Sequence, residues 1–210
     1  MTESATPGSE LEAATVIDVV FALKGSAIPR DHGYLLYLEI ARLAPWIDAE
    51  PLVGIHDVQG SDTGHGELML NRRAKLVIRV PKTRVDDIAS LTGKIIKVGA
   101  HSLEIGDYKT RALTLHTPLY AHCVTTGAHE EKDFATDIIR LLDEMGIDSR
   151  FICGKQQQIE TAEGKVAGYS LMLHGLPLEH AIRIQEVGLG GNRKLGCGIF
   201  IPHKAIQALV

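Results

Sequence analysis

Residues 188–202 read Gly-Leu-Gly-Gly-Asn-Arg-Lys-Leu-Gly-Cys-Gly-Ile-Phe-Ile-Pro, which places five glycines and two adjacent cations directly before a short apolar strand. Glycine tolerates positive φ and lets the backbone come close to a ligand, so consecutive N–H groups can surround an anion. The segment therefore predicts a phosphate-binding loop, although a flexible glycine-rich connection with two solvated cations would have the same spacing. The candidate phosphate-binding residues are Gly188, Gly190, Gly191, Asn192, Arg193, Lys194, Gly196 and Gly198.

This loop differs from two common nucleotide-binding motifs. A dinucleotide-binding fingerprint, Gly-x-Gly-x-x-Gly, follows a strand and opens a helix. Here Arg193 occupies the position of the third glycine, and the next predicted element is a strand. A Walker loop ends in Gly-Lys-Ser or Gly-Lys-Thr, and the chain contains neither tripeptide. Both motifs are excluded.

The segments around the loop predict a unit with the element order βαββαβ. The helix expected over 130–145 has one apolar face formed by residues such as Phe134, Ile138 and Leu142. The expected elements are, in chain order, a strand at 120–125, the helix at 130–145, strands at 150–159 and 165–174, a helix from Pro177 to about 187, and a closing strand at 198–202.

The first half of the chain predicts the same order of elements. Its first helix has an apolar stripe that includes Leu36, Ile40 and Leu43, with Asp31 as the expected N-cap and Pro45 near the end. The expected elements are a strand at 16–23, the helix at 32–47, a hairpin of 67–70 with 75–80, a short helix at 85–91 and a strand at 94–98.

Two consecutive βαββαβ units predict an α+β fold of tandem ferredoxin-like domains, each with an antiparallel sheet covered on one face by two helices. We expect a disordered tail at 1–13, a first domain at 14–117 and a second domain at 118–210 that carries the glycine-rich loop. Residues 99–116 would be added strands of the first domain or the connection itself.

The composition is typical of a globular protein, with 210 residues of which 45% are hydrophobic. The three cysteines are isolated and odd in number, which argues against a disulfide framework and fits a reducing compartment. Residues 1–13 lack the features of a targeting signal, and no apolar run approaches the roughly 20 residues of a membrane helix. We therefore expect a cytoplasmic protein.

The net charge of −4 does not favour a nucleic-acid partner, because domains that bind nucleic acids are often basic overall. Positive charge is nevertheless concentrated in a few short stretches, while acidic residues gather in the tail and in the helix predicted at 130–145. This segregation is compatible with one basic face. The basic stretches are Arg72, Arg73 and Lys75, then Arg193 and Lys194, then His203 and Lys204.

Tandem ferredoxin-like units with a glycine-rich loop before the last strand resemble the RAMP superfamily of CRISPR-associated proteins. Within it, the chain is similar to the repeat-processing endoribonuclease family, Cas6, and most similar to the compact variant of myxobacterial-type type I systems. Three segments carry the resemblance: the loop at 188–198, Ile-Pro-Arg-Asp-His-Gly-Tyr-Leu-Leu-Tyr at 28–37, and Ile-His-Asp-Val-Gln-Gly at 55–60.

The resemblance implies cleavage of CRISPR repeat RNA without a metal ion or cofactor, leaving a 2′,3′-cyclic phosphate. The attacking 2′-hydroxyl must lose a proton and the departing 5′-oxygen must gain one, and an imidazole can do either near neutral pH. The partners implied are precursor and mature guide RNA and other subunits of a guide-RNA surveillance complex. Retention of the cut RNA is left open.

Family members place the catalytic histidine in the first helix or just after it, so the resemblance implies His56 as the first candidate and His32 as the second. The two would act as an acid and a base, and His32 at a helix N-terminus would serve better as the base. Tyr34 and Tyr37 would orient the 2′-hydroxyl or stack on a base, although packing of the helix on its sheet explains them equally well.

The lysine that some family members carry after the loop histidine is missing, because Asp62 and Thr63 occupy that region. Another cation must then meet the negative charge of the transition state. The candidates are Arg193 and Lys194 of the loop, and the cluster of Arg72, Arg73 and Lys75.

Other chemistries find less support in the sequence. His122 and His129, like His174 and His180, lack the spacing of a compact metal motif, so we expect no metal site. No Gly-x-Ser-x-Gly elbow occurs. Two alternatives remain open: a non-catalytic RNA-binding RAMP subunit, and a tandem ferredoxin-like regulator that binds a small metabolite.

Overall fold

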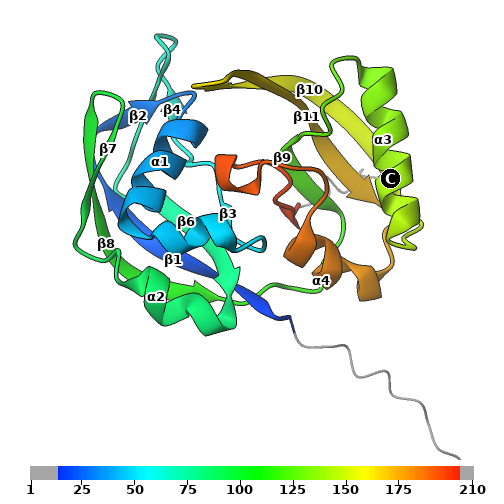
Figure 1. Cartoon of the computed structure of the whole chain (residues 1–210), viewed down its shortest axis with the longest axis horizontal. Helices are drawn as coiled ribbons and strands as arrows, with labels where there is room; N and C mark the ends of the chain where they lie inside the picture. Colours follow the sequence, from blue (N-terminus) through cyan, green and yellow to red (C-terminus); the bar gives the residue numbers. More distant parts are fainter. Residues whose placement is uncertain (1–13, 204–210) are drawn as a thin grey trace, which may run out of the picture.

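The computed structural model describes residues 14–203. Figure 1 shows the N-terminal unit with helices α1 and α2 on the left, and the C-terminal unit with α3 at its outer edge on the right. The N-terminal unit comprises β1 (Val16–Lys24), β2 (Ala27–Pro29), α1 (Gly33–Leu43), η1 (Pro45–Ala49), β3 (Gly54–Ile55), β4 (Ser61–Asp62), β5 (Glu67–Met69), β6 (Lys75–Pro81), η2 (Lys82–Arg84), α2 (Val85–Ala89), β7 (Ile95–Val98) and β8 (His101–Arg111). The C-terminal unit comprises β9 (Leu119–Val124), α3 (Glu131–Glu144), β10 (Arg150–Thr161), β11 (Gly164–His174), α4 (Leu178–Val187), η3 (Arg193–Leu195) and β12 (Ile201–Pro202).

The C-terminal unit has the predicted βαββαβ order. Its four strands lie in the order β10-β11-β9-β12, and every neighbouring pair is antiparallel. The hairpin of β10 and β11 closes through the turn at Thr161–Gly164, as the sequence predicts. The tandem ferredoxin-like fold is therefore confirmed for this half in both the order and the pairing of its strands.

The N-terminal sheet has the order β3-β6-β1-β8-β7, so the same arrangement is present with β7 as an added edge strand. The predicted hairpin of 67–70 with 75–80 is wrong. β6 is a central strand whose two edges pair with β1 and β3, which leaves no edge for β5. Instead, β5 pairs with β2 and β4 in a separate three-stranded sheet.

The fourth strand of the N-terminal unit is also different from the one expected. Residues 94–98 contribute β7, which lies at the edge, whereas β8 at 101–111 pairs directly with β1. β8 is 11 residues long and pairs with β1 from Asp18 to Lys24. The expected boundary at 117/118 falls in the connection between β8 and β9.

Helix α1 is shorter than the range 32–47 predicted from the sequence. It ends at Leu43, and Pro45 starts a separate 3₁₀ turn, because proline cannot donate the backbone hydrogen bond that would continue the helix. Asp31 is not the N-cap. Its carboxylate instead accepts a hydrogen bond from the backbone N–H of Glu160, 2.7 Å away in β10, and His32 occupies the cap position.

Each sheet packs its helices on one face only, and the other faces look toward each other. In β1, Val19, Phe21 and Leu23 belong to the N-terminal core, so Asp18 lies on the opposite face because side chains alternate along a strand. In β9, Leu119 and Ala121 belong to the C-terminal core. The opposing faces therefore carry the remaining alternate residues.

The predicted tail at 1–13 and Lys204 lie outside the described residues. None of the helices within 14–203 has the length and the apolar character that crossing a membrane requires.

Candidate active site

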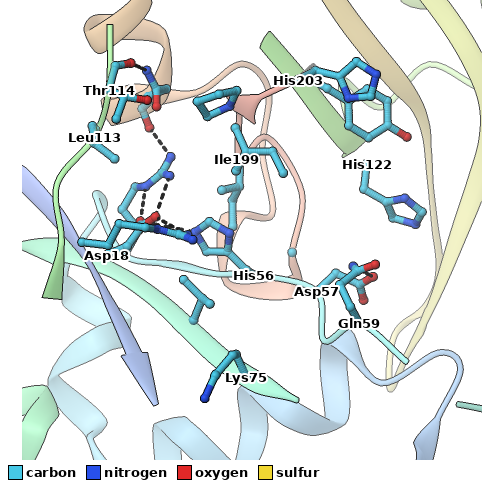
Figure 2. Close-up of a pocket in the computed structure, with 18 of the residues that line it drawn as sticks. Asp18, His56, Asp57, Gln59, Lys75, Leu113, Thr114, His122, Ile199 and His203 are labelled. Carbon is cyan, nitrogen blue, oxygen red and sulfur yellow. Dashed lines mark hydrogen bonds and ion pairs between the residues drawn. The ribbon is translucent and has the colours of Figure 1, made fainter. Parts of the chain in front are cut away.

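A cavity of about 760 Å³ lies between the two sheets, and we call it the central cavity. One wall comes from β1, β6, β8 and the segment that follows β3, and the other from β9 and the segment around β12 (Figure 2). Its ionisable side chains are Asp18, His56, Asp57, Arg73, Lys75, Arg79, Arg111, Tyr120, His122 and His203.

His56 lies in the wall of this cavity immediately after β3. Its backbone N–H donates to the carbonyl oxygen of Val77 at 2.9 Å, which extends the pairing of β3 with β6. The side chain keeps 13% of its surface exposed. Its Nε2 atom is 3.5 Å from Asp18 Oδ1, too long for a strong hydrogen bond, and has no hydrogen-bond partner within 14–203.

Burial lowers the pKa of His56 below that of a free imidazole, and the positive charges of Arg79 and Arg111 act in the same direction. The nearby carboxylate of Asp18 opposes them only in part. His56 is therefore a neutral imidazole at pH 7. A neutral imidazole can accept a proton from a hydroxyl group.

Asp18 is the buried centre of a charge cluster beneath His56. The strand register places it opposite Arg79 on β6 and Arg111 on β8. Arg79 donates to both carboxylate oxygens, at 2.7 and 3.3 Å, and Arg111 Nη2 donates at 2.9 Å. Burial alone would raise the pKa of Asp18, but its contacts with His56 and Arg79 lower it well below the usual range. Asp18 is therefore ionised.

Arg79 also connects the two units. Its Nη1 donates to the carbonyl oxygens of Gln185 in α4 at 2.7 Å and of Phe200 at 3.1 Å. The amide of Gln185 donates in turn to the carbonyl oxygen of Thr114, 2.8 Å away in the connection between the units. The wall that holds His56 is thus anchored to the C-terminal unit by one buried guanidinium.

The basic cluster predicted at 72–75 contributes two members to the central cavity. Arg73 and Lys75 line it from the turn before β6 and the start of β6, and neither makes an ion pair with a residue of 14–203. Arg72 is exposed in the same turn but does not line the cavity. The structure therefore brings Arg73 and Lys75 to the cavity that contains His56.

His32 does not lie in the central cavity. Its side chain is fully buried, with Nδ1 donating to the carbonyl oxygen of Pro29 at 2.9 Å. Its Nε2 is 2.9 Å from both the backbone N–H of Val58 and the carboxylate of Asp57. Burial alone would lower the pKa of His32, but the hydrogen bond and charge of Asp57 raise it. This geometry ties α1 to the loop that follows His56 and leaves no ring nitrogen for a substrate.

Tyr34 and Tyr37 line a different cavity of about 680 Å³, which we call the helix-side cavity. The hydroxyl of Tyr37 donates to Asp48 at 2.9 Å, and this hydrogen bond raises the pKa of Tyr37. The tyrosines are therefore not brought together with His56. Gly190, Gly191, Asn192, Arg193 and Lys194 line the same helix-side cavity.

The glycines of the 188–198 loop have a structural explanation. Gly188 has φ of 70°, and a Cβ atom there would overlap the carbonyl oxygen of Gly198 and the guanidinium of Arg193. At Gly190, with φ of 71°, a Cβ atom would overlap the carbonyl oxygen of Thr125 at the end of β9. The loop is folded tightly on itself and on β9, so its glycines do not by themselves indicate a ligand.

The two cations of the loop are engaged by the protein. Arg193 is 9% exposed and donates to the carbonyl oxygens of Gly198 and Glu186 at 3.2 and 2.9 Å. Its burial, together with the charge of Arg79, lowers the pKa of Arg193 to about 10. Lys194 Nζ donates to the carbonyl oxygen of Asp48 at 2.8 Å. Neither cation reaches the central cavity.

Sequence reasoning missed Asp18, Arg79, Arg111 and His122 as parts of the site. A signal was present for two of them, because Asp18 and Arg79 are charged residues inside otherwise apolar strand segments. His122 was considered only as a metal ligand, and within the described chain no group of three or more His, Cys, Asp or Glu side chains is placed to hold a metal ion.

Comparison with known proteins agrees with this fold. The family model described as Cas6 matches residues 17–205. The CRISPR-associated endonuclease Cas6 of Myxococcus xanthus strain DK1622 is 30% identical over 187 residues, which is 89% of this chain and 81% of the relative.

Solved structures show the same fold at low sequence identity. A protein of a Cas6-related gene from Pyrococcus furiosus has a TM-score of 0.64 and 17% identity, covering 88% of this chain and 97% of that chain. A RAMP protein that binds different RNA substrates has a TM-score of 0.67 and 16% identity, covering 90% of this chain and 100% of that chain. The match of the family model and the M. xanthus relative together show that the chain belongs to the Cas6 family of CRISPR-associated proteins.

Proposed function

We propose that this chain is an endoribonuclease that binds CRISPR repeat RNA in the central cavity and cleaves it without a metal ion. Membership in the Cas6 family supports the proposal, as does the M. xanthus relative, which is named an endonuclease. The observation that carries it is the position of His56 in the same cavity as Arg73 and Lys75. A proton acceptor and cations for a phosphate are thereby available at one site.

In the proposed reaction, His56 accepts the proton of the 2′-hydroxyl next to the scissile phosphate. The 2′-oxygen forms a bond to phosphorus while the bond from phosphorus to the 5′-oxygen breaks, which leaves a 2′,3′-cyclic phosphate and a 5′-hydroxyl. Arg73 and Lys75 stabilise the charge that develops on the phosphate oxygens. The departing 5′-oxygen takes its proton from a second donor.

Asp18 would orient the imidazole for this role. Because Asp18 is ionised and 3.5 Å from Nε2, it favours the tautomer with hydrogen on Nε2. The lone pair is then on Nδ1, which would be the basic atom. Arg79 and Arg111 hold the carboxylate in place through their hydrogen bonds.

The test is incubation of a labelled repeat hairpin with the protein in excess EDTA. We expect one discrete cut, which is slowed by about 10²–10⁴-fold in His56→Ala. His65→Ala is the matched control, because His65 is exposed in the turn between β4 and β5 and does not line the cavity. A 2′-deoxy nucleotide at the cut should abolish cleavage while preserving binding. The product end should resist phosphatase until acid opens the cyclic phosphate.

The alternatives predict different outcomes in the same assay. An intact repeat that binds with strong salt dependence would indicate a non-catalytic RNA-binding subunit, and absence of such binding would favour a metabolite-binding regulator. A requirement for metal, or normal cutting by His56→Ala, would contradict the proposed mechanism. Recovery of the cut RNA with the purified protein would test retention of the guide RNA and its delivery to other subunits.

A further inference from the structure

Cleavage by 2′-hydroxyl attack requires a second proton-transfer group if the proposed function is correct. His56, acting as a neutral base, takes up a proton and does not supply one to the leaving group in the same step. The attacking and leaving oxygens lie on opposite sides of phosphorus in an in-line displacement. The acid is therefore expected on the wall of the central cavity that faces His56.

His122 lies on that opposite wall. It is an exposed residue of β9 between Ala121 and Cys123, which are both buried, so alternation directs its side chain away from the C-terminal core. Figure 2 shows His56, which follows β3, and His122, which belongs to β9, at different places in the cavity. The imidazole of His122 makes no hydrogen bond or ion pair with any residue of 14–203.

His122 also lies where two cavities meet. A polar cavity of about 630 Å³ adjoins the central cavity, and the two share Asp57, Gln59, His122 and Gly196 as lining residues. Asp57 directly follows His56, so this junction is next to the proposed base. A strand of RNA that passes from one cavity to the other would run between the two histidines.

The other candidate donors fit less well. Both ring nitrogens of His32 are occupied inside the protein, and Tyr34 and Tyr37 line the helix-side cavity. The ring of His203 packs on that of Tyr120 with 5.4 Å between centroids, and it does not line the polar cavity. Lys75 lies at the start of β6, on the same wall as His56, and not on the wall that faces it.

We propose that His122 is the general acid of the reaction and donates a proton to the 5′-oxygen as its bond to phosphorus breaks. His56 gains the proton of the 2′-hydroxyl while His122 loses one to the 5′-oxygen. The pair returns to its starting protonation state by exchange with water. An imidazole suits this role because its charge changes near neutral pH.

The test compares two RNA substrates, one with an ordinary 5′-oxygen and one with sulfur at the 5′ bridging position. A thiolate leaves without protonation, so loss of a general acid slows only the oxygen substrate. We expect His122→Ala to cut the oxygen substrate at least about 100-fold more slowly and the sulfur substrate within a few-fold of the unmodified protein. His56→Ala should be slow on both substrates. His129→Ala, which removes an exposed imidazole from the loop between β9 and α3, should leave both rates unchanged.

Three outcomes would overturn the assignment of His122. His122→Ala could cut at the normal rate, or it could be slowed equally on both substrates. Alternatively, His203→Ala rather than His122→Ala could be slow on the oxygen substrate and normal on the sulfur substrate. Failure of the unmodified protein to cut either substrate would instead overturn the proposed function. Thermal unfolding of His122→Ala should match that of the unmodified protein, because the side chain is exposed.

Discussion

The central cavity and the loop at 188–198 both contain neighbouring basic residues, but the fold uses those residues differently. In the loop, Arg193 is buried and hydrogen-bonded to backbone carbonyls, and Lys194 donates to Asp48. In the cavity, Arg73 and Lys75 are exposed and make no ion pair within the described chain. A cation beside glycines can thus stabilise the loop itself, whereas cations on an open sheet face remain available to a ligand.

The largest expected effect concerns the loop. Gly188→Ala should destabilise the protein by about 4 kcal/mol or more, because the new Cβ atom would overlap the backbone of Gly198 at positive φ. Chemical denaturation measures this change. Gly127→Ala is the control, since Gly127 also has positive φ, at 91°, but open space around it, and it should lose only about 1–2 kcal/mol. If both variants lose the same free energy of unfolding, the loop is not tightly packed.

The next effect concerns the fixed charges of the cavity. Asp18→Asn should lower the free energy of unfolding by about 3 kcal/mol, because Arg79 is left buried without its carboxylate. Glu104→Gln, which breaks the exposed pair with Lys24, should lose less than about 1 kcal/mol. If Asp18→Asn lowers the free energy of unfolding no more than this control does, the charge cluster around Asp18 is not needed to hold the cavity wall in place.

The pH dependence of cleavage tests the proposed role of His56 as the general base. The pKa of His56 is lowered by burial, and a base is active above its pKa. The acidic limb of kcat/KM should therefore have its midpoint below about pH 6.5, with a tenfold loss per unit as the pH falls further. The 5′-sulfur substrate needs no general acid, so on it a rate that falls as the pH rises through this region would contradict the assignment of His56 as the base.

The smallest expected effect is on the salt dependence of RNA binding, which distinguishes the cations of the central cavity from those of the loop. Arg73→Ala and Lys75→Ala should each reduce the slope of log binding constant against log salt by about 0.7 for a single-stranded segment. Lys194→Ala should leave this slope unchanged, since its ammonium group is engaged by Asp48. An equal reduction for Lys194→Ala would show that the loop also contacts RNA phosphates.

The sequence predicted the elements of the C-terminal unit well because each strand and helix has a clear local pattern. It failed at β5 and β6, whose local pattern suits a hairpin. The pairing depends on distant partners, since β6 is enclosed by β1 and β3 and β5 joins β2 and β4. Local periodicity reports which face of a strand is apolar, and it does not report which strand lies beside it.

For the same reason, the sequence predicted some residues of the candidate site but not which of them lie together. His56 and the cluster with Arg73 and Lys75 were proposed separately, and only the fold places them around one cavity. His32, Tyr34 and Tyr37 were proposed with His56, yet they lie in a buried contact or in the helix-side cavity. Nothing in the spacing of His122 or Asp18 ties either residue to His56.

The amino-acid sequence by itself determined the βαββαβ unit of the C-terminal half and the kind of residues available for chemistry, because hydrophobic periodicity and residue type are local properties. The tertiary structure alone decided which side chains share a cavity. Strand register brings Asp18, Arg79 and Arg111 together across three strands, and the packing of one sheet against the other sets His122 opposite His56. Burial then selects among chemically identical groups, leaving His32 and Arg193 inside the protein and Arg73 and Lys75 at its surface.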